Sequence, residues 1–161
     1  MVEALTWLEA SPLGQAVRGA GVWSYAVINL MHIAGVATLF GSVLVLDLKL
    51  LGLFPRAPLA IVSVPTVPLA AAGFALAATS GICLLATNAT EYADNPFLLL
   101  KFGAIFIALL NVAVMHCMPA WRLHSTGPAS SAQRRQLALG GGVSLASWAT
   151  ALAAGRMLGY W

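Results

Sequence analysis

The sequence has very little charge for its length. Only 8% of its 161 residues are Asp, Glu, Lys or Arg, whereas soluble domains carry about 25%. Apolar residues make up 60% of the chain. Eight basic and five acidic side chains cannot cover the water-facing surface of a domain of this size. Lipid must therefore be the solvent for most of the exterior.

The sequence also lacks the motifs of several enzyme classes. Five acidic residues give little support for metal-assisted hydrolysis, and there is no Gly-x-Ser-x-Gly, His-Glu-x-x-His or paired Cys-x-x-Cys pattern. The glycine run at 140–142 lies in an apolar stretch and has no P-loop lysine. Basic residues are scattered, with only Arg134 and Arg135 adjacent, which indicates membrane topology and no nucleic-acid partner. We expect no independent catalytic activity.

Cysteines are few, and a positively charged leader is missing. Cys83 and Cys117 should lie near opposite faces of a bilayer, whereas disulfide Cα atoms must approach within about 7 Å. We therefore expect two free, buried cysteines. Residues 1–10 contain Glu3 and Glu9 and no basic residue, unlike a signal peptide. We expect Met1 to remain on the protein.

Four apolar stretches are each long enough to span a bilayer, which takes about 20 helical residues. They cover about 22–46, 67–87, 97–118 and 137–160. They predict a single transmembrane domain over 1–161, an all-α integral membrane four-helix bundle. Residues 3–10, which include Trp7, suit a short interfacial N-terminal helix.

Local signals predict where helices start and stop. Ser11-Pro12 and Asn95-Pro96 have the pattern of an N-cap followed by proline at the first helical position. Asp47 indicates the exit of the first span. The prolines that follow it are predicted to exclude helix at Pro55, Pro58 and Pro65.

The basic residues predict an orientation. The first and third connections share a side and hold Lys49, Arg56, Arg122, Arg134 and Arg135, and the third, residues 120–136, also holds His124. Only Arg18, Lys101 and Arg156 lie near the other side. The positive-inside rule then places both termini on the non-cytoplasmic side. Trp161 suits an aromatic anchor.

Small residues recur every four positions in two spans and let another helix approach closely. The first set is Gly73, Ala77 and Gly81, and the second is Gly142, Ala146, Thr150 and Ala154. Such faces suit packing within the bundle, a homo-oligomer or a larger membrane complex.

Ionisable groups inside the spans are the functional hypotheses, because they are expensive in hydrocarbon. His32 shares a helix face with Tyr25 and Asn29, a polar stripe that we expect to face protein. Its imidazole suits a haem iron or a copper ion, or alternatively a hydrogen bond across helices. Asn111 should lie about one turn from the level of His32, and a contact between them is predicted.

His116 lies at the cytoplasmic end of the third span, among Met115, Cys117 and Met118. Sulfur and imidazole suit copper, but adjacent helical residues point in different directions and cannot converge on one ion. A single haem between His32 and His116 faces a depth offset of roughly 12 Å at 1.5 Å per residue. This offset would shrink if the first span begins later or is strongly tilted. Otherwise each histidine serves a separate site, or only one of them is a ligand.

Two cations complete the set of candidates. Lys101 is expected to snorkel to the outer surface. Arg156 suits a pair with Glu91 or Asp94, a lipid phosphate or a haem propionate, or simple interfacial snorkelling.

The chain resembles an uncharacterised family of small bacterial four-helix integral membrane proteins. The resemblance covers nearly the whole length and rests on these motifs: His32-Ile-Ala-Gly35, Gly41, Leu46-Asp47-Leu48-Lys49-Leu50-Leu51-Gly52, Thr79-Ser80-Gly81, Tyr92-x-x-Asn95-x-Phe97-x-x-x-Lys101, Asn111 with His116, and Gly155-Arg156. It implies a multi-pass protein of the bacterial inner membrane. An acidic residue often stands in relatives where this chain has Asn29, so a proton relay there is in doubt. The architecture is more distantly similar to copper-resistance membrane proteins and small b-type cytochromes.

Three functions are weighed. The first is a haem b-binding, cytochrome-like electron-transfer subunit, with His32 and His116 as axial candidates, Asn29 and Asn111 orienting them, and Arg156 on a propionate. The second is a copper-handling or small-solute membrane protein that uses Met31, His32, Met115, His116 and Met118. The third is a non-catalytic accessory subunit of a larger membrane complex, with no cofactor.

Overall fold

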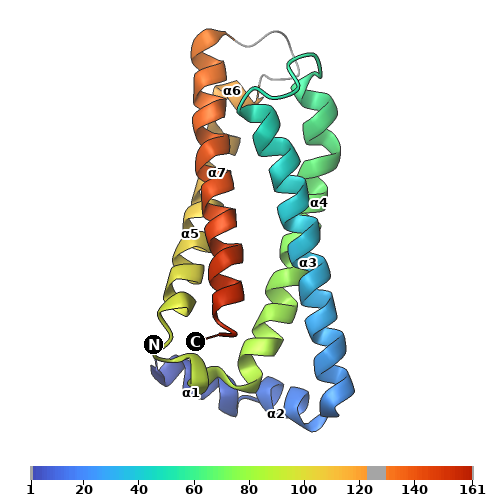
Figure 1. Ribbon diagram of the computed structural model, residues 1–161, viewed down its shortest axis with the longest axis vertical. Helices are drawn as coiled ribbons and strands as arrows, with labels where there is room; N and C mark the ends of the chain where they lie inside the picture. Colours follow the sequence, from blue (N-terminus) through green and yellow to red (C-terminus); the bar gives the residue numbers. More distant parts are fainter. Residues whose placement is uncertain (1, 123–129, 161) are drawn as a thin grey trace.

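The computed structural model describes residues 2–122 and 130–160, which contain helices and no strand. Four long helices lie side by side and antiparallel (Figure 1): α3 (Gly21–Leu50), α4 (Leu59–Thr87), α5 (Pro96–Cys117) and α7 (Ser131–Met157). Each is long and apolar enough to cross a membrane. The predicted all-α membrane bundle is confirmed. The predictions for Trp161 and for the 123–129 part of the third connection, His124 included, lie outside the described residues.

The predicted caps are confirmed, together with a third. The Ser11 hydroxyl accepts from the Gly14 N–H at 3.2 Å, at the start of α2 (Pro12–Gly19). The Asn95 side chain accepts from the Phe97 N–H at 3.0 Å and starts α5. Ser130 and Gln133 form a capping box at the start of α7. These side chains satisfy N–H groups that have no partner within the helix.

Helix α4 corrects one prediction. It begins at Leu59, eight residues before the predicted start of its span, and contains Pro65 and Pro68. The prediction that Pro65 excludes helix is wrong, although Pro55 and Pro58 do precede α4. Proline is tolerated in transmembrane helices where other groups satisfy the freed backbone.

Helices α3 and α4 touch through their backbones. A Cβ added to Gly35 would lie 2.6 Å from the Ala77 nitrogen, and one added to Gly73 would lie 2.5 Å from the Leu39 nitrogen. The small-residue face of α4 is therefore a packing face, used within the chain. In α7 the buried small residues are mostly different from the predicted set: Gly140, Gly141, Ser144, Ser147, Ala151 and Ala154.

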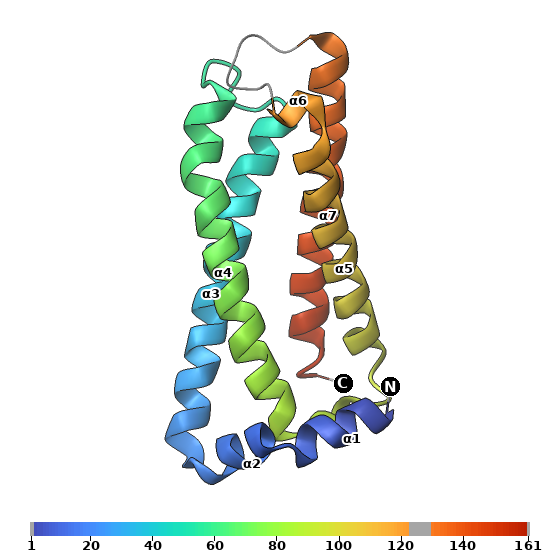
Figure 2. The same ribbon diagram turned by 180° about the vertical axis from the view of Figure 1, so that it is seen from behind.

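The N-terminal helices close the end of the bundle where both termini lie (Figure 2). Helix α1 (Val2–Ala10) and α2 run across this end, as the predicted interfacial helix would. The Arg18 guanidinium donates to the carbonyls of Ala86 and Thr87 at the C-terminus of α4. Glu9 accepts from the Thr90 N–H and hydroxyl at 2.8 and 2.7 Å, and these bonds lower the pKa of its carboxyl below the usual 4.5.

The ends of the bundle carry the charges as predicted. The connection after α3 and the start of α7 lie at the end opposite the termini. Lys49, Arg56, Arg134 and Arg135 belong to that end. Both cysteines are free, as expected. Cys117 is exposed, however, so the expectation that both are buried is wrong for it.

The four spans form two pairs. Helix α3 packs closely with α4, α5 packs with α7, and α3 also contacts α7. Helices α4 and α5 have no comparable contact, although they border the same side of the bundle in Figure 2. The bundle is therefore closed on three sides and weakly closed between α4 and α5.

Candidate functional site

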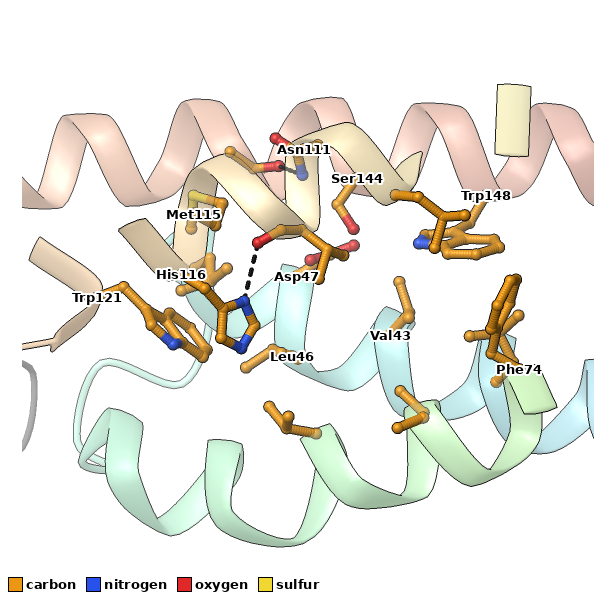
Figure 3. A pocket seen from close by; sticks show the side chains of 18 residues that line it. Val43, Leu46, Asp47, Phe74, Asn111, Met115, His116, Trp121, Ser144 and Trp148 are labelled. Atoms are coloured by element: carbon orange, nitrogen blue, oxygen red, sulfur yellow. Dashed lines mark hydrogen bonds between the residues drawn. The ribbon is translucent and has the colours of Figure 1, made fainter. Parts of the chain in front are cut away.

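A cavity of about 320 Å³ lies among the four spans, with walls from α3, α4, α5 and α7 (Figure 3). Most of its wall is aliphatic or aromatic. Its side chains with polar atoms are few: Asp47, Asn111, His116, Trp121, Ser144 and Trp148. An apolar pocket with a few convergent polar groups is the usual form of a small-molecule site.

Asp47 is the most unusual residue of this cavity. It lies three residues before the end of α3 at Leu50, near the predicted exit of the first span, but its side chain is only 2% exposed. It follows Leu39 and Val43 at four-residue spacing and so shares their buried face. The Ser144 hydroxyl lies beside its carboxyl group (Figure 3). Its Oδ2 atom is buried and has no hydrogen-bond partner among the described residues.

Trp148 supplies a second unmatched group. Its side chain is 6% exposed, and its ring meets Phe74 edge-on at 5.9 Å between centroids. Its Nε1 donor is buried without an acceptor in the described part of the chain. Trp148 follows Ser144 by one helical turn, and both line the cavity. Two residues that line the cavity therefore carry one buried unmatched acceptor and one buried unmatched donor, each costing about 1–3 kcal/mol when left unpaired.

Asn111 and His116 line the cavity from α5. The Asn111 amide donates to the Gly140 carbonyl at 3.0 Å and ties α5 to α7. The predicted contact between Asn111 and His32 is therefore wrong. His116 Nδ1 donates to the Val112 carbonyl at 2.8 Å, and its ring lies 5.4 Å from the Trp121 ring.

His32 belongs to a different place, the seam between α3 and α4. Its Nδ1 donates to the Ala77 carbonyl at 2.9 Å and lies 3.3 Å from the Ser80 hydroxyl. The ring lies against Gly81, where an added Cβ would be 2.9 Å from Cε1. Asn29 and Tyr25 are exposed on α3, so the prediction that this stripe faces protein is wrong for them.

The structure does not assemble the predicted ligand sets. His32 lies in the α3–α4 seam, whereas His116 lines the cavity beside Met115. Met31 is 45% exposed on the outer surface. In residues 2–122 and 130–160, no three His, Cys, Asp or Glu side chains gather as a metal site would require. Of the residues named for copper, Met31 and His32 therefore lie outside the cavity that Met115 and His116 line.

Of the two cations near the end of the bundle that holds the termini, Arg156 has a protein partner and Lys101 packs against α7. The Arg156 guanidinium donates to the Tyr160 hydroxyl and lies 4.5 Å from the centre of that ring. The guanidinium therefore binds Tyr160, just after the end of α7, instead of pairing with Glu91 or Asp94. Lys101 extends along α7, 3.6 Å from where a Gly155 Cβ would be.

Comparison with models of known protein families, with curated proteins and with solved structures finds no match. The site must therefore be interpreted from its own chemistry. Its key residues, Asp47, Ser144 and Trp148, were missed by the sequence reasoning. The available signal was the spacing Leu39, Val43, Asp47, which continues an apolar face into an acidic residue.

Proposed function

We propose that the chain is an integral membrane protein that binds a small lipophilic ligand in the cavity between α4 and α5. The observation that carries the proposal is a pair of buried, unmatched groups, Asp47 Oδ2 and Trp148 Nε1, on two residues that line one cavity. Buried polar groups without partners are rare, because each loses its bonds to water on burial. A bound molecule that supplies the missing partners accounts for both.

The size of the cavity is consistent with this role. An engineered apolar cavity of about 150 Å³ binds benzene. The cavity here is about 320 Å³ and so has room for a substituted ring or a short branched chain. This function belongs to the small-solute class that the sequence suggests. It is supported by Asp47 and Trp148, whereas the sequence pointed to methionines and histidines.

The test measures saturable binding of a radiolabelled arene by the purified protein in lipid nanodiscs. A variant with a bulky side chain at the mouth of the cavity is compared with wild type. Tritiated para-heptylphenol is the probe. Ala71 lines the cavity on α4 and is exposed at its mouth, whereas its neighbour Ala72 is exposed and outside the lining. We expect Ala71→Trp to abolish saturable binding and Ala72→Trp to leave it unchanged. Equal binding by both variants would contradict the proposal.

Haem binding by His32 is the second candidate function. What supports it is the Nδ1–H bond to the Ala77 carbonyl, because metal-ligating histidines almost always donate their other ring N–H to such a group. In the neutral tautomer this leaves Nε2 as the ligating atom. A haem shared with His116 has no support, since the two histidines line different regions of the bundle.

A reduced-minus-oxidised visible spectrum with iron analysis tests the haem proposal. We expect His32→Ala to abolish the Soret and α bands of the purified protein, with His116→Ala as the control that retains them. Full haem retention in His32→Ala would overturn the assignment. Iron-free protein with saturable arene binding would leave only the first proposal.

The remaining proposals concern location and partners. The resembled family supports a bacterial inner membrane protein, and the basic connections support termini on the non-cytoplasmic side. The close α3–α4 packing uses one small-residue face internally. A homo-oligomer or accessory-subunit role would have to use other faces of the bundle.

A further inference from the structure

We infer that the ligand is a lipophilic phenol, with its hydroxyl between Asp47 and Trp148, and that it reaches the cavity sideways from the bilayer. This inference rests on the proposed function, because it names the chemical class of the ligand for the same site. Its two parts stand on separate observations: the hydrogen-bonding capacity of the cavity wall, and the exposure of the residues at its mouth.

The two unmatched groups need a ligand group that both donates and accepts a hydrogen bond. Asp47 Oδ2 needs a donor, and Trp148 Nε1–H needs an acceptor. A hydroxyl supplies both, since it has one O–H and two lone pairs. An ammonium has only donors and would leave the indole N–H unmatched, and a ketone has only acceptors and would leave the carboxyl oxygen unmatched.

An aromatic body suits the rest of the wall. Phe74 and Trp148 present two rings, in an edge-on arrangement, at one part of the cavity (Figure 3). Aromatic rings pack favourably against one another in offset or edge-on geometry. A single substituted ring also matches a volume of about 320 Å³, given that about 150 Å³ is enough for benzene.

The mouth of the cavity faces the side of the bundle. Leu109 and Val112 on α5 line the cavity and are nevertheless 40% and 39% exposed, and Ala71 is exposed opposite them on α4. All three lie in helices that are long and apolar enough to cross a membrane. Helices α4 and α5 make no extensive contact that would close this side. A molecule dissolved in the bilayer can therefore reach Asp47 without passing through water.

The experiment is competition against tritiated para-heptylphenol in nanodiscs, with three matched arenes. Unlabelled para-heptylphenol donates and accepts, its methyl ether only accepts, and para-heptylbenzylamine as its ammonium only donates. We expect the phenol to bind about threefold to tenfold more tightly than the ether or the amine, as one net hydrogen bond predicts.

Two variants assign each bond to a residue. In Asp47→Leu the preference for phenol over ether should disappear, because the acceptor for the O–H is gone. In Trp148→Phe the phenol and the ether should weaken equally, by about threefold to tenfold, while the amine is unchanged. Trp23→Phe is the control, since Trp23 is 86% exposed on α3. The elution volume and melting temperature of each variant show that it is folded.

The outcomes separate the two claims. Tightest binding of the amine, or equal binding of all three arenes, overturns the phenol inference and leaves a lipophilic ligand site. Saturable binding that is identical in wild type, Asp47→Leu and Trp148→Phe places the arene elsewhere and overturns both claims. No saturable binding of any arene also overturns both and means that water alone serves the two groups.

Discussion

Replacing Asp47 by leucine should make the ligand-free protein more stable. The carboxyl group is 2% exposed and leaves Oδ2 unmatched, which costs about 1–3 kcal/mol. The cavity has room for the larger leucine side chain. At roughly 2–4 °C per kcal/mol for a chain of this size, the apparent melting temperature should rise by about 2–12 °C. Fluorescence-monitored thermal unfolding in detergent measures it.

Ser144→Ala is the matched variant for this prediction. It removes the hydroxyl that lies beside the Asp47 carboxyl (Figure 3) and leaves that group with less polar surroundings, so the melting temperature should fall. In the Asp47→Leu background the same change should have little effect, because the pair is already broken. A lower melting temperature for Asp47→Leu, or additive effects in the double variant, would contradict this account of the site.

Alanine at Gly35 or Gly73 should strongly destabilise the bundle. The added Cβ would lie 2.5–2.6 Å from a backbone nitrogen of the facing helix, and backbone cannot move aside as a flexible side chain can. Overpacking of this kind costs about 1–3 kcal/mol and occasionally more. We expect each variant to lower the melting temperature, and the double variant to prevent recovery of folded protein, as judged by size-exclusion chromatography.

Gly41→Ala and Gly103→Ala are the controls, because an added Cβ there meets nothing within 4 Å. Both positions lie inside helices, where alanine is favoured over glycine by about 0.5–1 kcal/mol. These variants should therefore be as stable as wild type or slightly more stable. Equal stability of all four single variants would show that α3 and α4 do not touch through their backbones.

The fold was predictable because lipid imposes a simple rule on sequence. Spanning segments must be long, apolar and helical, so four such stretches predict four helices. Caps such as Ser11 and Asn95 were predictable because the side chain that satisfies the helix end is adjacent in sequence. The start of α4 was not, because the cost of Pro65 depends on what surrounds that turn.

The site was much less predictable than the fold. Asp47 stands two residues before Lys49, so in the sequence it looks like a charged residue at the end of a span. Only the packing of α3 against its neighbours shows that the Asp47 side chain is buried. Its partners Ser144 and Trp148 lie about a hundred residues away in sequence and look like ordinary span residues. The histidines attracted attention by residue type alone. Which helix each one faces decides its chemistry, and that depends on packing between distant segments.

The most direct test of the ligand site is an anomalous diffraction measurement. Crystals of the protein grown with ortho-bromo-para-heptylphenol would be measured at the bromine absorption edge. The account predicts a bromine peak inside the cavity, beside Asp47 and Trp148 and open to the gap between α4 and α5. A peak only on the outer surface, for example in the groove beside Gly103 and Thr150, would contradict it, as would no peak at saturating phenol.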